Sequence, residues 1–326
     1  MSRGSFTISL DFELFWGVRA NRSIEEYQDN LLGVYSAIPK ILDLFKKYDI
    51  HATWAIVGFL FHPTIEEIQK RRASILPNYK RKEVDPYIYL DTLTPPYTKE
   101  FSKMHCSMEL IKKIALSPNQ EIATHTYSHL FSYEPQENSS QAFKEDIEEA
   151  IDVALESGYH IESLVFPRNQ IDRDNIEILD RVSIKSYRGN PSHWAYSNGD
   201  RPTKSISLRI YRLVDTYLNL SGYHTSIPTP SKGVIELKSS MMLRPYFSRL
   251  SYLEGLKIRR VKEAMRHAGI HGHNFHLWWH PHNFGTSLEK NLTNLEELLQ
   301  YFQELRLIYK MDSLTMEEVT RDVCKK

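Results

Sequence analysis

The chain has 326 residues, with 41 basic and 41 acidic side chains and a formal net charge of zero. This balance argues against electrostatic binding to nucleic acid, to an anionic membrane or to a polyanionic substrate. The longest strongly apolar segment, near residues 52–61, is far shorter than the roughly 20 residues of a membrane span, and the only cysteines are Cys106 and Cys324. We therefore expect a soluble chain of the reducing cytoplasm, without signal peptide, membrane span or disulfide framework.

Strand-like and helix-like segments alternate along the chain, which predicts a parallel sheet or barrel in one α/β domain over residues 1–326. The expected strands, in chain order, are Phe6–Leu10, His51–Phe59, Gln120–Thr124, Glu162–Phe166, Ser183–Tyr187, His273–Trp279 and Leu307–Met311. The expected helices are Ile24–Tyr48 with a kink near Pro39, one after Ser107, one through Phe143 to Ala154, Thr203–Tyr217, Ser251–Ala268, and one with an apolar stripe from Leu288 to Phe302. Residues 62–103 and 220–245 are expected to be surface insertions.

Polar side chains follow two of these strands, at the point where each strand ends. Asp11 and Glu13 close the first strand, and strand alternation projects both from the same face. His125 and His129 follow the strand Gln120–Thr124, and their spacing places both imidazoles on one side of a helical turn. Two histidines and one carboxylate form a common catalytic zinc set, and the second carboxylate is free to take a proton.

Each of these patterns also has a structural interpretation without function. A spaced carboxylate pair at the end of a strand is often solvated or caps a helix, and two histidines with this spacing arise by chance. The position of both patterns at the ends of buried strands favours the functional interpretation, because α/β folds carry their chemistry there.

Together the motifs resemble those of the polysaccharide deacetylase superfamily, also called NodB-homology or carbohydrate esterase family 4. Asp11-Phe12-Glu13 is similar to its first motif in the spaced form of some intracellular branches, and His125-Thr126-Tyr127-Ser128-His129 to its second. Leu277-Trp278-Trp279-His280 is similar to the strand that ends in the acid histidine. The resemblance, from Asp11 to about Thr315, implies a distorted (β/α)7-type barrel, one divalent metal ion and hydrolytic removal of an N-acetyl group from a sugar.

The same resemblance implies a role for each motif residue. Glu13, His125 and His129 hold the metal ion, and Asp11 is the catalytic base. His280 is the catalytic acid, a role that suits an imidazole with an ordinary pKa of about 6.5, and His282 is the alternative. Arg168 keeps Asp11 ionised and oriented, and a backbone amide near Tyr127 stabilises the oxyanion. The sequence does not identify the residue that orients His280.

Aromatic residues near these motifs are candidates for contact with sugar rings. If His280 faces the lumen of the barrel, His276 and Trp278 share that face. Trp16 and Trp194 offer further flat surfaces, although aromatic residues near a barrel are more often part of the core. The candidate substrate-binding residues are thus Trp16, Tyr127, Trp194, Trp278 and His282. His267, His271, His273 and His276 are not expected to form a second metal site.

The leading hypothesis is a metal-dependent deacetylase acting on an N-acetylated sugar or glycan precursor, such as a nucleotide- or lipid-linked intermediate. Zinc is the first choice of metal, and cobalt, nickel and iron are alternatives. The alternative functions are an amidase for a small non-sugar amide and a catalytically silent carbohydrate-binding protein. The oligomeric state, the sugar and the acyl group are not readable from the sequence.

Overall fold

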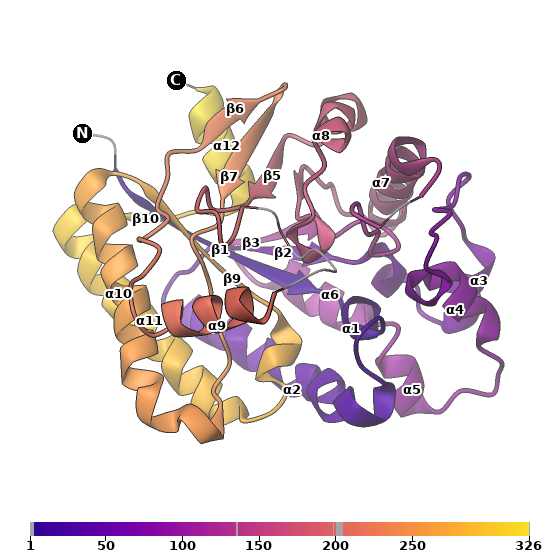
Figure 1. The fold of residues 1–326 in the computed structure, drawn as a ribbon, viewed down its shortest axis with the longest axis horizontal. Helices are drawn as coiled ribbons and strands as arrows, with labels where there is room; N and C mark the ends of the chain where they lie inside the picture. Colours follow the sequence, from indigo (N-terminus) through magenta and orange to yellow (C-terminus); the bar gives the residue numbers. More distant parts are fainter. Residues whose placement is uncertain (1–2, 135, 198, 200–204, 326) are drawn as a thin grey trace.

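The computed structural model describes residues 3–134, 136–197, 199 and 205–325, and its centre is one curled β-sheet (Figure 1). The hydrogen-bonded strand order is β6-β7-β5-β4-β3-β2-β1-β9-β8, with β10 paired to β1. Among the strands in the described part of the chain, only β6 and β7 pair antiparallel. The sheet is a curled half-barrel, which confirms the predicted distorted-barrel class. The strands are β1 Ser5–Phe12, β2 Ala52–Ile56, β3 Gln120–Thr124, β4 Ser163–Leu164, β5 Ser186–Gly189, β6 Thr229–Ser231, β7 Val234–Lys238, β8 Met241–Met242, β9 Asn274–Trp279 and β10 Asp312–Ser313.

Helices lie around the sheet in the alternation that the sequence predicts. They are α1 Phe15–Val18, α2 Ile24–Lys47, α3 Ile65–Lys70, α4 Pro86–Thr92, α5 Lys99–Lys103, α6 Met108–Leu116, α7 Ser139–Glu156, α8 Arg173–Leu179, α9 Ile206–Asp215, α10 Glu254–His271, α11 Leu288–Tyr309 and α12 Met316–Cys324. Short 3₁₀ turns follow β2 at Gly58–Phe61, β4 at Pro167–Asn169 and β9 at Pro281–Phe284. None of the helices in the described ranges combines the length and apolar character needed to cross a membrane.

The central strand β1 is buried on both faces from Phe6 to Phe12. Its neighbours β2 and β9 run parallel to it. The carboxyl ends of β1, β2, β3 and β9 therefore meet at one edge of the sheet. The sequence of β1 alternates, with Phe6, Ile8, Leu10 and Phe12 on one face and the polar Thr7, Ser9 and Asp11 on the other. The polar face is buried too, and its side chains are hydrogen-bonded: Thr7 to Asn274, and Ser9 and Asp11 to Arg188.

The long helices follow their apolar periodicity. The α11 stripe is confirmed, with Leu295, Leu299 and Phe302 fully buried. The helix α2 begins at a serine cap, where Ser23 accepts from the Glu26 amide at 3.3 Å. Pro39 lies within α2, and the assigned helix continues through it.

Several predicted elements differ from the structure. The expected closing strand Leu307–Met311 is wrong, because α11 extends to Tyr309 and the final pairing with β1 starts at Asp312. The segment 220–245 is not only an irregular insertion, since it supplies β6, β7 and β8 to the sheet. The helix predicted over Thr203–Tyr217 is observed as α9, and residues 203–204 lie outside the described residues. Pattern analysis misses strands as short as β8 because two residues carry no periodicity.

Candidate metal centre

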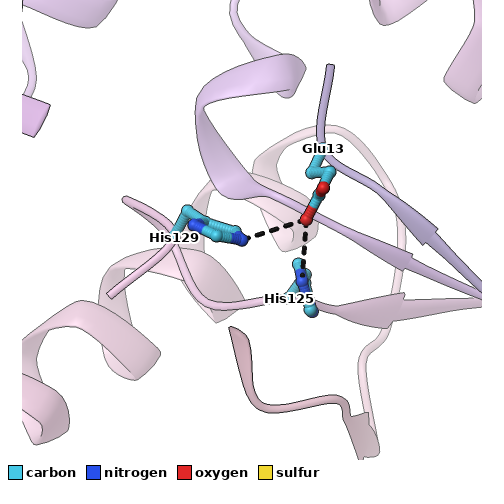
Figure 2. A group of neighbouring side chains, drawn as sticks. All are labelled: Glu13, His125 and His129. Atoms are coloured by element: carbon cyan, nitrogen blue, oxygen red, sulfur yellow. Dashed lines mark hydrogen bonds and ion pairs between the residues drawn. The ribbon is translucent and has the colours of Figure 1, made fainter. Parts of the chain in front are cut away.

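Three buried side chains from the carboxyl edge of the sheet meet in one group, Glu13, His125 and His129 (Figure 2). Glu13 follows β1, and the two histidines follow β3. The Glu13 Oε2 atom lies 3.3 Å from His125 Nε2 and 3.0 Å from His129 Nε2. Ligands about 2.0–2.1 Å from one tetrahedral zinc ion stand about 3.4 Å apart. The three atoms therefore have the separations of a metal-ligand set.

The histidine pair reaches this position in a way that differs from the prediction. Residues 125–129 form a loop, and Thr126 and His129 have positive φ angles of 62° and 59°. The predicted helical turn is therefore wrong, although the two imidazoles do converge. Asp146 of α7 holds the loop, accepting from the amides of Tyr127 at 2.7 Å and Ser128 at 3.2 Å.

The hydrogen bonds around the group prepare it for a cation. The carbonyl oxygen of Val165 accepts from His125 Nδ1 at 2.8 Å, so the lone pair of a neutral ring lies on Nε2, toward Glu13. Among the described residues that Nε2 has no hydrogen-bond partner, although it is buried. Gly17 of α1 passes so close that an added Cβ would lie 1.9 Å from Glu13 Cδ. The residues present thus fit a divalent metal ion.

The charge states also suit metal binding. Burial raises the pKa of Glu13, but the charge of His280 and the close contacts with the rings of His125 and His129 outweigh it and hold that pKa well below its ordinary value. Burial lowers the pKa of His129 to about 4, against the opposing effect of Glu13. At neutral pH the group therefore contains a carboxylate and a neutral His129, the forms that bind metals.

Asp11 forms a buried ion pair with Arg188 of β5. Two parallel bonds join them, Nη1 to Oδ1 at 2.6 Å and Nη2 to Oδ2 at 2.7 Å. Arg188 also donates to Ser9 Oγ at 3.0 Å and to Asn169 Oδ1 at 2.9 Å. Burial raises the pKa of Asp11, but the Arg188 charge and hydrogen bond, with the charges of His125 and His280, outweigh it, so the pKa lies below its ordinary value.

The predicted pairing of Asp11 with Arg168 is wrong. Arg168 lies in the 3₁₀ turn after β4, with its guanidinium carbon 4.1 Å from the centre of the Phe131 ring. Arg188 was missed because it stands in a four-residue strand that sequence patterns place only coarsely. Its position at the carboxyl end of a predicted strand was the available signal, the same signal that marked Asp11.

His280 faces both carboxylates from the end of β9. Its Nε2 lies 3.8 Å from Asp11 Oδ2 and 3.5 Å from Glu13 Oε1. Its Nδ1 lies 3.4 Å from the Asn283 side-chain amide nitrogen, so Asn283 is the neighbour that can orient the ring. The His280 side chain is 22 % exposed, whereas His282 is only 4 % exposed. A histidine that serves as acid must reach the substrate, and this geometry favours His280.

The ring of His282 packs against the ring of His280. The two rings stack with centroids 5.0 Å apart, and Tyr27 packs edge-on against His282 at 5.5 Å. Burial, followed by the charge of His280, lowers the pKa of His282 to about 3. His282 is therefore a neutral ring beneath the acid candidate, with little surface to offer a substrate.

Of the predicted aromatic contacts, Trp278 has the expected position. It is partly buried and, with His280 and Asn169, lines a cavity of about 610 Å³ beside the site. Its ring centre lies 4.4 Å from the Arg188 guanidinium carbon. Trp194 is exposed, packs against Tyr211 of α9 at 5.1 Å, and is not among the residues that line this cavity.

Two predicted substrate contacts are contradicted. Trp16 is fully buried in the core, where its indole nitrogen donates to the His105 carbonyl oxygen at 2.9 Å. Tyr127 is also buried, with its hydroxyl 2.9 Å from His62 Nε2. Because its amide already donates to Asp146, that amide is not free for an oxyanion.

The comparisons with known proteins concern the family and the fold. Residues 32–187 match the family model described as polysaccharide deacetylase, a family of hydrolases that act on amide bonds in carbohydrates. This stretch includes His125 and His129 but not Asp11, Glu13 or His280. No curated protein matches the chain.

Solved structures share the fold at low sequence identity. A Mycobacterium smegmatis protein assigned as a polysaccharide deacetylase has a TM-score of 0.59 and 12 % identity, covering 100 % of this chain and 94 % of its own. A probable polysaccharide deacetylase from Pseudomonas aeruginosa PAO1 has a TM-score of 0.55 and 12 % identity, with 99 % and 90 % covered. Puue allantoinase has a TM-score of 0.53 and 11 % identity, with 97 % and 89 % covered.

Proposed function

We propose that this chain, of which residues 32–187 match the polysaccharide deacetylase family model, is a metal-dependent hydrolase that removes the N-acetyl group from a sugar or glycan precursor. The observation that carries the proposal is the buried group of Glu13, His125 and His129, with Asp11 and His280 beside it. Two imidazoles and a carboxylate favour zinc, and cobalt, nickel or iron are alternatives.

The metal ion, when bound by Glu13, His125 and His129, would acidify water and polarise the amide carbonyl group. Val165 fixes the tautomer of His125, so that Nε2 faces the ion. Burial of the three ligands keeps competing water away and strengthens their interaction with a cation.

Asp11 is the proposed base. Arg188 binds both of its oxygens and leaves further lone pairs free toward the site. Because its pKa lies below the ordinary value, Asp11 stays ionised at neutral pH and is a weak base. A weak base can take a proton only from an acidified water molecule. This requirement agrees with the position of Asp11 beside the proposed metal ligands.

His280 is the proposed acid. Its Nε2 faces the two carboxylates, and the side chain keeps some exposure toward the cavity in which a sugar can lie. A proton on Nε2 passes to the amine as the carbon–nitrogen bond breaks. The donor is the protonated ring, which becomes a neutral imidazole once Nε2 has given up its proton, and Asn283 beside Nδ1 would orient it.

We place the reaction in the reducing cytoplasm, a location supported by the two free thiols, of which Cys324 is exposed. The substrate in this proposal is an N-acetylated sugar that arises before export. The experiments below use the purified chain and do not depend on this location.

The experiment that tests the function measures metal content and acetate release together. The reconstituted chain should hold about one metal ion and release acetate from an N-acetylated sugar. His125→Ala should lose both, because it removes a ligand. Asp11→Asn should keep the metal and lose turnover by about 10² to 10⁴, the usual contribution of a general base.

The exposed histidine of α10 supplies the matched control: His271→Ala should retain both metal and activity. A chain that stays metal-free after reconstitution would contradict the proposal and favour a carbohydrate-binding role. Near-normal turnover in Asp11→Asn would remove Asp11 from the base role.

A further inference from the structure

The cavity of about 610 Å³ beside His280 has a charge that the chain as a whole lacks. Its described lining residues include five cations and one carboxylate, namely Arg209, Arg212, Arg244, Lys257, Arg260 and Asp215. The whole chain is balanced at 41 basic and 41 acidic side chains. This volume lies in the range of small-molecule sites. The basic character is therefore a local property of this cavity.

Helix α9 contributes to this charge through an unusual orientation. Arg209, Arg212 and Thr216 at its end line the cavity, while Ile206 and Ile210 are 75 % and 56 % exposed. An amphipathic helix ordinarily turns its apolar face to the core. In Figure 1, α9 lies across the front of the molecule, beside α10. Arg209, which is exposed, and the half-buried Arg212 therefore border the cavity together with Leu213, while Ile206 and Ile210 face outward.

The carboxylate of the cavity is engaged elsewhere. Asp215 accepts from the Tyr196 hydroxyl at 2.7 Å, from the Leu220 amide at 2.9 Å, and from the Ser221 amide and hydroxyl at 2.8 and 2.6 Å. Arg260 stands 3.9 Å from it. Asp215 thus serves mainly to hold the chain after α9, and it compensates Arg260 weakly.

Arg260 is accordingly a buried cation with unused donors. It is 4 % exposed, and its Nη2 donates to the Gly222 carbonyl oxygen. Its Nε and Nη1 have no hydrogen-bond partner within the described part of the chain. Lys257, by contrast, pairs with Glu254 at 2.7 Å. Burying a cation without a matched anion is costly, and a ligand anion in the cavity would offset that cost.

From this geometry we propose that the cavity binds the phosphate group of a phosphorylated N-acetylated amino sugar. The proposal rests on the proposed function, because Trp278 and His280 line the same cavity and join it to the metal centre. Guanidinium groups match phosphate oxygens through paired hydrogen bonds. The two donors of the buried Arg260 that lack a partner among the described residues, with the positive charge of the neighbouring arginines, favour an anionic group with several oxygens such as phosphate. A ligand with one phosphate group needs only a local group of cations, which agrees with a chain that is not basic overall.

The phosphate can belong to a soluble sugar phosphate or to a lipid-linked sugar, and both present the same group to the arginines. The exposed stripe of Ile206, Ile210 and Val214 lies on the same helix as Arg209 and Arg212. An alkyl chain on the phosphate would find apolar surface there. The test therefore includes one probe of each kind.

The first measurement compares kcat/KM for N-acetylglucosamine 1-phosphate and uncharged N-acetylglucosamine. We expect the phosphorylated probe to be preferred by on the order of tenfold or more, the worth of a charge-assisted hydrogen bond. Arg209→Gln should raise KM about tenfold for the phosphorylated probe and leave the uncharged probe unchanged. The control Arg259→Gln, on the exposed side of α10, should alter neither.

Equal kcat/KM for the two probes, or an equal effect of Arg209→Gln on both, would overturn the phosphate site. A farnesyl ester of the same sugar phosphate, in detergent micelles, separates the two sources. Ile210→Ser should lower kcat/KM for the farnesyl probe alone if the natural phosphate is lipid-linked. No effect of Ile210→Ser would assign the soluble source, with the phosphate site retained.

Calorimetric binding of glucosamine 1-phosphate, the deacetylated product, distinguishes failure of this inference from failure of the proposed function. Binding that weakens in Arg209→Gln, without acetate release from any probe, would keep the phosphate site and reject the deacetylase. Acetate release without phosphate preference or product binding would keep the deacetylase and reject the phosphate site.

Discussion

Asp11 and Glu121 are buried carboxyl groups at opposite ends of the same parallel sheet, and their environments differ. Asp11 stands at the carboxyl end of β1 and is 2 % exposed, and Glu121 stands at the amino end of β3 and is 8 % exposed. The pKa of Asp11 lies below its ordinary value, whereas burial raises the pKa of Glu121 to about 7. Similar burial is therefore accompanied by opposite shifts of the pKa in the two carboxyl groups.

The partners explain the difference. Asp11 meets the permanent charge of Arg188 through two bonds. Glu121 accepts from neutral groups, the Thr53 hydroxyl at 2.6 Å and the Glu317 amide at 3.1 Å. A hydrogen bond from a neutral donor offsets only part of the free-energy cost of burying a carboxylate, whereas the charge of a guanidinium group can outweigh that cost. At one end of the sheet the carboxyl group is thus held in its charged form, and at the other end Glu121 ties β2, β3 and α12 together.

The largest expected effect comes from removing the cation beside Asp11, so that this carboxyl group, like Glu121, is buried without a cationic partner. Arg188→Ala leaves the Asp11 carboxylate buried without a cation, which should lower the free energy of unfolding by about 3–5 kcal/mol. Urea denaturation measures this change. The pKa of Asp11 should rise, and deacetylation should be lost.

Arg188→Lys is the matched variant, because it keeps the charge but not the paired geometry. It should recover most of the stability and only part of the activity. Unchanged stability in Arg188→Ala would mean that Asp11 does not depend on this ion pair.

An intermediate effect is expected at the other end of the sheet. The pKa of Glu121 is about 7 in the folded chain against 4.5 ordinarily, so the folded state binds the proton more tightly. This contribution to stability is complete below pH 4.5 and is lost as the pH rises through about 7. The loss amounts to about 3 kcal/mol by pH 8.

Glu121→Gln should abolish this part of the pH dependence, because the amide does not titrate. Urea denaturation of both metal-free proteins at a series of pH values measures the difference between them. An unchanged slope between pH 5 and 8 in the variant would show that other groups cause the dependence.

The smallest effect is expected at Arg168, the residue that sequence similarity pairs with Asp11. Its guanidinium packs on Phe131, so Arg168→Gln should cost about 1 kcal/mol or less, in the range of a cation–π contact. Its kcat should fall by less than that of Arg188→Lys. The reverse order of kcat values would restore the pairing with Arg168.

The candidate metal-ligand set was predictable because its information is local. Glu13 follows a strand marked by alternating apolar residues, and His125 and His129 follow another strand. Strand ends in a parallel sheet share an edge, so the meeting of these residues follows from the elements alone. The apolar stripe of α11 was predictable for the same reason, since its period lies within one segment.

The assignments that failed depend on positions that no local pattern encodes. Trp16 has the flat aromatic ring that suits contact with a sugar, and only the packing of the fold shows that it belongs to the core. The amide of Tyr127 looked available, and only the fold brings Asp146 of α7 to it.

The sequence by itself therefore determined the central strands of the sheet, the edge that carries the candidate site and the three metal-ligand candidates, because periodicity and strand ends are properties of single segments. Tertiary structure alone decided that Arg188 rather than Arg168 meets Asp11, across 177 residues of chain, and that Arg209 and Arg212 of α9 border the cavity beside His280. The physical reason is that the pairing of buried charges depends on which strands become neighbours and in what register, and this is settled by the packing of the whole sheet.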